Sequence, residues 1–543
     1  MFTYFHAYMP ETWDAQVKAG LINGHAGIRF CQSIDIEERL KFNDLAAVGG
    51  DLHRLVRETR MPFYIDRLQG GCFIENYPYD MRLVDVYREL LGEDFYGFQM
   101  HEWMSNYRTD LIKLKELTAA DWNEERITET ILRSFPFPHV FLEAMNAREM
   151  AVLGKPTSFS EFYANAEWLF RDRQRYTAGS LLPCDSSYMA YRLELQNGAK
   201  RIMPEIGNQT ANTRIQMSYA RGMAKAYGAD FGGYYEPWGG SPFSACCYHR
   251  EGKNEWNIGS ADFPFQTCGD NGGSSRSLQM RMQLYAYFAG ASFFSEEWGM
   301  CNTFYDWKDF ELSPYGRIKK DFIRLTEAYP DIGVPVTPIA VVLSKDVPFP
   351  DNSFSDERAL ASFPVEGSLA DKLTLARRGL RELFLSHDGH VGTESPSLVN
   401  GTVPDALDIV HEDRFDPTAY DYLVDLTGSN DLAKAHGARI CAAEDVPALL
   451  ERLLPCSFEG AALKQLTRRA DGSYYLLLTN NSGVSRTVAN GELLLPEADT
   501  AVTVTPKDGM TLRGLEGNGR LIKNGDLYRI EIPAGGWMLC LLG

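Results

Sequence analysis

Carboxylate and aromatic side chains recur together where apolar segments of the sequence end. Three such ends carry a glutamate closely followed by a tryptophan: His101-Glu102-Trp103, Glu236-Pro237-Trp238 and Glu296-Glu297-Trp298. One carboxylic acid can protonate a leaving oxygen while a second carboxylate attacks carbon or activates water, which is the chemistry of glycosidic bond cleavage. Tryptophan suits the same chemistry, because the apolar face of a sugar ring stacks on an aromatic ring.

Other polar residues near these ends are candidates for binding sugar hydroxyls. The expected substrate-binding set is His101, Trp103, Asp66, Arg67, Glu205, Tyr234, Trp238, Glu297 and Trp298. Glu205 could instead form a structural ion pair with Arg67 or Arg29. Of Glu296 and Glu297, one must face the inside of a barrel and the other the outside, because side chains alternate along a strand.

Eight short apolar runs, separated by stretches with helical character, must position these residues. The strands are expected near 2–9, 27–34, 62–68, 96–103, 179–184, 201–206, 231–236 and 291–297. Helices are expected near 11–22, 36–58, 80–92, 158–173, 186–198, 210–227 and 276–289, with one more beginning at Ser313-Pro314. This alternation predicts an α/β fold with a (β/α)8 TIM barrel, in which the active site lies at the carboxyl ends of the strands. A doubly wound open sheet is the alternative, although it rarely needs eight such units.

The pattern changes after the barrel. Residues 1–334 are expected to form the catalytic barrel, and 335–455 repeat strand and helix patterns that predict a flavodoxin-like α/β domain. Residues 456–543 alternate short strands with turns, which is typical of a small β-sandwich.

Composition and net charge narrow the classes of molecule that this protein could bind. The net charge of −19 argues against nucleic acid and anionic membranes, and favours a neutral carbohydrate substrate. The sequence has ten scattered cysteines, lacks signal-peptide features at its N-terminus and lacks an apolar segment long enough to span a membrane. Together these features predict a cytoplasmic protein. The sequence contains no phosphate-binding glycine motif at a strand–helix junction, so no cofactor is expected. Cys246-Cys247 and His249 suggest zinc only weakly, because adjacent cysteines rarely bind one ion.

The strand-end glutamates resemble those of the clan A retaining glycoside hydrolases. The resemblance implies that Glu102, ending the fourth strand, is the acid/base and that Glu236, ending the seventh, is the nucleophile. The clan usually has asparagine before the acid/base, where it binds the sugar 2-hydroxyl, whereas this chain has His101. Either His101 substitutes for it, since histidine can donate the same hydrogen bond, or the assignment of Glu102 as the acid/base is wrong; we favour the first. If the strand count is wrong by one, Glu296 or Glu297 becomes the nucleophile instead.

The order of the parts is similar to glycoside hydrolase family 42 and its relatives. That resemblance implies a homo-oligomer, with a trimer as the expected assembly, and a retaining exo-acting β-glycosidase. It favours β-galactosides, with β-glucosides and β-mannosides as alternatives. A barrel that binds carbohydrate without cleaving it is the alternative from another class. A metal-dependent hydrolase is a third possibility, and it would require a cluster of metal ligands at the strand ends.

Overall fold

A computed structural model gives the structure of the chain. It describes residues 2–30, 42–66, 79–134, 145–207, 212–236, 275–297, 303–304, 309–347, 367–385, 398–487 and 491–543. Among these residues, no helix is long and apolar enough to cross a membrane.

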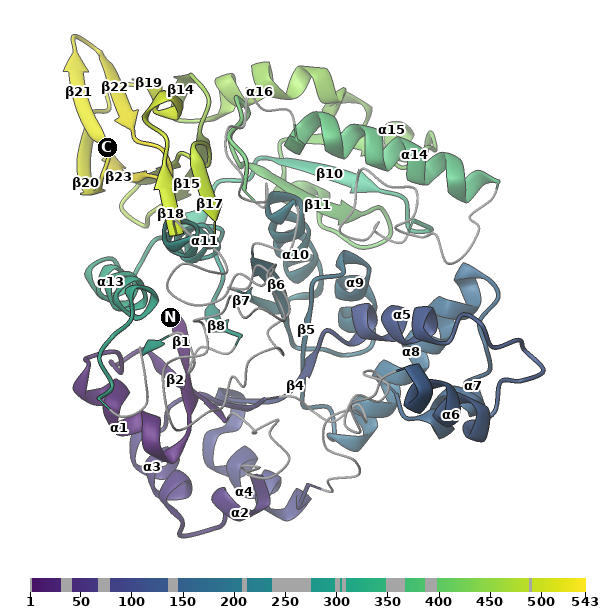
Figure 1. Ribbon diagram of the computed structural model, residues 1–543. Coiled ribbons are helices and arrows are strands. Elements are labelled where there is room, and N and C mark those ends of the chain that lie inside the picture. The colour runs from purple at the N-terminus through teal and green to yellow at the C-terminus, as the bar shows by residue number, and fades with distance from the viewer. Residues whose placement is uncertain are drawn as a thin grey trace.

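Eight parallel strands close into a barrel in the order in which they occur in the sequence (Figure 1). They are β1 (Thr3–Tyr8), β2 (Ala26–Phe30), β3 (Phe63–Ile65), β4 (Phe95–His101), β5 (Leu181–Asp185), β6 (Arg201–Gly207), β7 (Asp230–Glu236) and β8 (Phe293–Glu296). Pairing of β1 with β8 closes the ring. The eight predicted strands and the predicted TIM barrel are therefore confirmed, including the fourth and seventh positions in the count.

Side chains fill the inside of the barrel. The inner cluster comprises Phe5, Tyr64, Leu182, Cys184, Met203, Tyr234 and Phe293, all of them buried. They come from β1, β3, β5, β6, β7 and β8, so the barrel is a packed core below the strand ends.

Helices surround the barrel on the outside. They include α1 (Pro10–Lys18), α3 (Asp51–Thr59), α4 (Met81–Leu91), α5 (Trp103–Lys113), α8 (Phe159–Tyr176), α9 (Tyr188–Gln196), α10 (Thr213–Tyr227), α11 (Arg276–Phe288) and α13 (Pro314–Ala328). The predicted start of α13 is confirmed, since the Ser313 hydroxyl accepts from Gly316 N–H and Pro314 is the first helical residue. The prediction of a single helix over 36–58 is wrong for residues 42–58, the part of this range that the structure describes. There α2 (Phe42–Leu45) ends before α3, because Gly49 takes φ 83° and turns the chain.

A second sheet packs against the outside of α10 (Figure 1). Its parallel strands are ordered β11 (Leu407–His411), β10 (Ile339–Leu343), β12 (Tyr422–Leu426) and β13 (Ile440–Cys441). Helices α14 (Ser368–Leu380), α15 (Asp431–His436) and α16 (Val446–Leu453) accompany it. Gly222 of α10 permits the close approach, because a Cβ there would lie 2.2 Å from the Ile409 carbonyl oxygen. The parallel α/β character is observed, whereas the name flavodoxin-like stays a prediction.

The C-terminal part consists of antiparallel sheets. One contains β14 (Cys456–Glu459), β19 (Thr500–Pro506), β22 (Leu527–Ile532) and β21 (Arg520–Asn524). The other contains β20 (Leu512–Gly517), β23 (Trp537–Leu542), β16 (Tyr474–Thr479), β15 (Leu463–Arg468) and β9 (Val334–Pro335). Strand β17 (Val484–Thr487) pairs antiparallel with β18 (Gly491–Leu494). The all-β character is observed, and the sandwich arrangement and domain boundaries stay predictions.

Candidate active site

His101 lies at the centre of a group of carboxylates at the carboxyl end of the barrel. Its Nε2 atom lies 3.4 Å from Glu205 Oε1 and 3.3 Å from Glu297 Oε1. Its Nδ1 atom lies 3.6 Å from Glu102 Oε2. The structure therefore brings together four predicted site residues, contributed by the ends of β4, β6 and β8.

The cluster places like charges close together in a buried setting. Glu205 and Glu297 are buried, and Glu102 is the more open member with a side chain that is 34% exposed. Burial raises the pKa of Glu205, the negative charge of Glu297 raises it further, and the hydrogen bond and charge of His101 act in the opposite direction. Crowded carboxylates with a perturbed pKa at a strand end are typical of functional sites.

Glu102 begins a tight turn between β4 and α5. It has a left-handed backbone, with φ 45° and ψ 31°. Its N–H donates to the Cys184 carbonyl over 2.6 Å, and its carbonyl accepts from Asn106 N–H over 2.7 Å. The Asp185 carboxylate accepts from Met104 N–H over 2.7 Å, which ties the same turn to the end of β5. Such a conformation costs a non-glycine residue about 1–3 kcal/mol and occurs often at functional sites, which supports a functional role for Glu102.

Glu236 is the last residue of β7 and is buried. It pairs with Gly207, the last residue of β6. A Cβ at position 207 would lie 2.0 Å from the Glu236 carbonyl oxygen and 2.9 Å from Glu236 Oε2. The absence of a side chain at Gly207 therefore makes room for Glu236. Sequence reasoning missed this glycine, although its position at the end of a predicted strand was a usable indication.

Arg29 and Asp66 form a buried ion pair beside the cluster. Arg29 Nη2 lies 2.7 Å from Asp66 Oδ2 and donates to the Tyr234 hydroxyl over 2.9 Å. The Tyr234 ring meets the His101 ring edge to face, with centroids 5.5 Å apart. Arg29 thus pairs with Asp66 rather than serving as the structural partner considered for Glu205. Tyr234 is fully buried in the inner cluster, so it supports the site from below.

Glu296 and Glu297 face opposite sides of the barrel wall, as the alternation predicts. The Tyr4 hydroxyl donates to Glu296 Oε1 over 2.6 Å, and Lys319 Nζ lies 2.6 Å from Glu296 Oε2. Glu296 therefore lies between the barrel and its outer helices. Glu297 is the inward residue, because it faces His101.

Trp103 does not lie in the cluster. It is the first residue of α5, where it is 2% exposed and donates its indole N–H to Glu194 of α9 over 2.8 Å. Its ring packs against Phe170 of α8, with centroids 5.4 Å apart. This side chain fills the space between helices and offers no face to a sugar, so its expected role in substrate binding is corrected to packing. The left-handed turn at Glu102 is what directs it outward.

Several predicted residues lie outside the described parts of the chain. These are Arg67, Trp238 and Trp298 of the substrate-binding set, together with Cys246, Cys247 and His249 of the weak zinc hypothesis. Their roles stay predictions.

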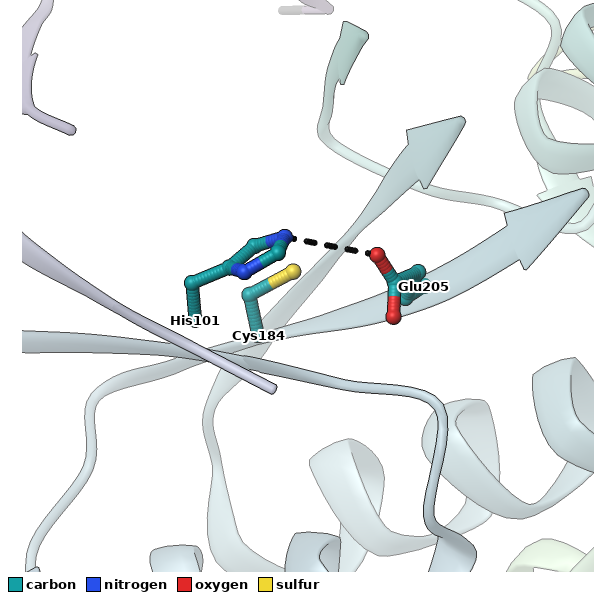
Figure 2. Close-up of side chains that lie close together, drawn as sticks. All are labelled: His101, Cys184 and Glu205. Atoms are coloured by element: carbon teal, nitrogen blue, oxygen red, sulfur yellow. Dashed lines mark ion pairs between the residues drawn. The ribbon is translucent and has the colours of Figure 1, made fainter. Parts of the chain in front are cut away.

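Cys184 joins His101 and Glu205 in a group that sequence reasoning did not find. The ligand atoms of these three side chains lie within 4.8 Å of one another (Figure 2). Cys184 lies on β5 and pairs with His101 on the neighbouring strand β4. One nitrogen, one sulfur and one oxygen donor at this spacing could hold a metal ion.

Comparisons with known proteins do not assign a family. No family model matches the sequence, and no curated protein is significantly similar to it. Similar solved structures include the catalytic module of a family 98 glycoside hydrolase from Streptococcus pneumoniae TIGR4, with a TM-score of 0.42, 10% identity and coverage of 99% of this chain and 98% of that one. An α-L-fucosidase from Paenibacillus thiaminolyticus has a TM-score of 0.44 and 11% identity, and the match covers 100% of this chain and 99% of that one. A β-galactosidase from Halorubrum lacusprofundi has a TM-score of 0.43 and 10% identity, and the match covers 99% of this chain and 98% of that one.

All three of these neighbours are glycoside hydrolases. These structures have TM-scores below 0.5 and share about one residue in ten with this chain, so they carry no argument about its function. Its chemistry is therefore inferred from its own residues. The resemblance to clan A and to family 42 stays a prediction.

Proposed function

We propose that the chain is a retaining, exo-acting β-glycosidase that cleaves oligosaccharides or small glycosides by double displacement. The observation that carries this proposal is the position of two glutamates on one closed barrel, Glu102 directly after the fourth strand and Glu236 at the end of the seventh. The Glu102 side chain is one-third exposed, which suits a group that exchanges protons with a leaving group and then with water. Glu236 is buried, which suits a nucleophile held in one orientation.

In the first step, a Glu236 carboxylate oxygen attacks the anomeric carbon. The bond between that carbon and the glycosidic oxygen breaks, and protonated Glu102 gives its proton to the departing oxygen. In the second step, Glu102 removes a proton from water while the water oxygen attacks the anomeric carbon. The ester bond to Glu236 breaks, and the sugar leaves with its original anomeric configuration.

The surrounding residues support this chemistry in two ways. Glu297 and Glu205 offer acceptors for sugar hydroxyls, and His101 holds both of them within 3.4 Å of one imidazole nitrogen. A strained left-handed turn fixes Glu102, and Gly207 leaves room for Glu236. We propose β-galactosides as the first substrates to test, followed by β-glucosides and β-mannosides.

The decisive experiment traps the covalent intermediate. The full chain is incubated with 2-deoxy-2-fluoro aryl β-glycosides of the three sugars. Fluorine at carbon 2 slows both steps, and a good aryl leaving group speeds the first one, so the covalent intermediate accumulates. Peptide mapping by mass spectrometry should find the added sugar on Glu236. A label on Glu297 would instead assign the nucleophile to the neighbouring strand.

Rates of aryl glycoside hydrolysis provide the second test. Glu236→Gln should lose on the order of 10⁵-fold in kcat, and Glu102→Gln about 10²–10⁴-fold, with circular dichroism unchanged. An activated aryl leaving group should rescue the first step of Glu102→Gln, because it needs no proton, and should not rescue Glu236→Gln. If wild type binds the sugars but cleaves none of the α- and β-glycosides in a panel, the chain is a carbohydrate-binding barrel and the proposal fails.

A further inference from the structure

Three metal-binding residue types occupy adjacent strands at one level of the barrel. His101 ends β4, and the register pairs it with Cys184 on β5. Cys184 in turn pairs with Met203 on β6, and Glu205 lies two residues further along that strand, on the same face. The sheet register therefore fixes the proximity of the imidazole, the thiol and the carboxylate. Figure 2 shows the three side chains directed toward one another, with the sulfur between the other two groups.

The spacing of the donor atoms is compatible with a shared cation. His101 Nε2 and Glu205 Oε1 are 3.4 Å apart, whereas a charge-assisted N–H···O bond is about 2.7–2.9 Å long. Two ligands that each lie about 2.0–2.3 Å from a tetrahedral zinc ion are roughly 3.3–3.6 Å apart. One ligand atom from each of His101, Cys184 and Glu205 lies within 4.8 Å of the other two, so a small side-chain movement brings all three donors to one ion.

The charge around the three donors also favours a cation. Glu205, Glu236 and Glu297 are buried carboxylates at this end of the barrel. Buried carboxylates are stabilised by counter-charges, and a divalent cation would supply one here.

We propose that His101, Cys184 and Glu205 bind a divalent cation of the zinc class. Mixed sulfur, nitrogen and oxygen donors select zinc over magnesium or calcium, which prefer oxygen ligands alone. Three protein ligands leave a fourth tetrahedral position, and Glu297 Oε1, which is 3.3 Å from His101 Nε2, is placed to take it or to orient a water there.

The proposed site goes beyond the glycosidase proposal. It shares Glu205 and Glu297 with the proposed sugar-binding groups, and it meets the proposed acid/base through His101. A cation on Nε2 of His101 leaves the imidazole proton on Nδ1, which faces Glu102 Oε2 at 3.6 Å. The cation would therefore fix the tautomer of the residue that stands before the proposed acid/base. This makes the site a device for positioning Glu102, with the chemistry of bond cleavage still carried by the glutamates.

The test measures binding in the absence of any sugar. The full chain is stripped with a chelator, then titrated with Zn²⁺ in competition with a chromophoric chelator and with Co²⁺ in an absorption spectrometer. We expect one tight equivalent of Zn²⁺ and, with Co²⁺, a thiolate-to-cobalt charge-transfer band. Cys184→Ala should abolish the band and weaken Zn²⁺ binding by about 100-fold or more, and His101→Gln should weaken binding to a similar extent.

Matched variants separate this site from others. Cys540→Ala removes a buried thiol of β23 and should leave the band and the affinity unchanged. The double variant Cys246→Ala/Cys247→Ala should also leave them unchanged. The proposal is overturned if stripped wild type binds no tight equivalent, if the band survives in Cys184→Ala, or if the band disappears in the double variant.

Two further measurements keep the outcomes distinct. If Cys184→Ala does not fold, X-ray absorption of zinc-loaded wild type decides the question, because the site requires one sulfur at about 2.3 Å among nitrogen and oxygen ligands. Failure of wild type to cleave glycosides while it binds one zinc through Cys184 would refute the function and leave the metal site standing. Sugar trapping on Glu236 without tight zinc binding would do the reverse.

Discussion

The two faces of the barrel wall at the end of β8 carry adjacent glutamates in contrasting surroundings. On the outer face, Glu296 is met by the Tyr4 hydroxyl at 2.6 Å, the Gln283 amide at 2.9 Å and the Lys319 ammonium at 2.6 Å. On the inner face, Glu297 shares His101 with a second carboxylate. Both residues are buried.

This difference teaches that burial alone does not identify a functional carboxylate. Glu296 has donors and a cation that satisfy its charge, so the fold is more stable with it in place. The inner carboxylates Glu205 and Glu297 lie around one imidazole, and burial raises the pKa of Glu205, which is typical of a functional site. Four substitutions test that contrast.

Glu296→Gln should destabilise the protein by about 3–5 kcal/mol, because it leaves the buried Lys319 ammonium without its counter-charge. Urea unfolding followed by circular dichroism measures this loss, and the activity per folded molecule should stay near that of wild type. The double variant Glu296→Gln/Lys319→Met removes both charges and should recover part of the stability. Equal stability of wild type and Glu296→Gln would show that the outer face is not structural.

Glu297→Gln is the same chemical change one residue further along. It should lower kcat/KM for the best aryl glycoside by about 10- to 100-fold, the effect of losing one charge-assisted hydrogen bond to substrate. Its unfolding free energy should be unchanged or higher, since one of the crowded charges is removed. Loss of stability with unchanged kcat/KM would reverse the assignment of the two faces.

Gly207→Ala tests how closely the inner face is built. The added Cβ would overlap the Glu236 carbonyl oxygen, so β6 and β7 must separate and Glu236 must move. We expect a loss of about 2 kcal/mol in unfolding free energy and a fall in kcat with KM less affected. Gly24→Ala is the control, because nothing lies within 4 Å of a Cβ there. Wild-type kcat in Gly207→Ala would show that Glu236 tolerates displacement.

Trp103→Phe extends the comparison to the outer face of the β4 end. The change leaves buried Glu194 without the indole donor, and should cost about 1–2 kcal/mol of stability. KM for aryl glycosides should not change, because the ring packs against Phe170 away from the cluster. A several-fold rise in KM would return Trp103 to the substrate-binding set.

Much of this organisation follows from the sequence alone. The alternation of short apolar runs with helical stretches predicts the eight strands and therefore the closed barrel, because each local pattern fits its element. Since parallel strands end at one face of a barrel, the glutamates at 102, 205 and 236 can be expected there together. The cap at Ser313-Pro314 is equally local, and it too is observed.

Tertiary structure decided what depends on contacts between elements. The alternation rule says that Glu296 and Glu297 face opposite ways, but the partners that meet each side chain, Lys319 and His101, come from distant segments. The glutamate-tryptophan pattern at 102–103 predicts two neighbouring site residues. The structure places Glu102 beside His101 but packs Trp103 between helices, because a left-handed turn directs Trp103 outward. The proximity of Cys184 to His101 depends on how β4 and β5 align, a long-range register that no local pattern records.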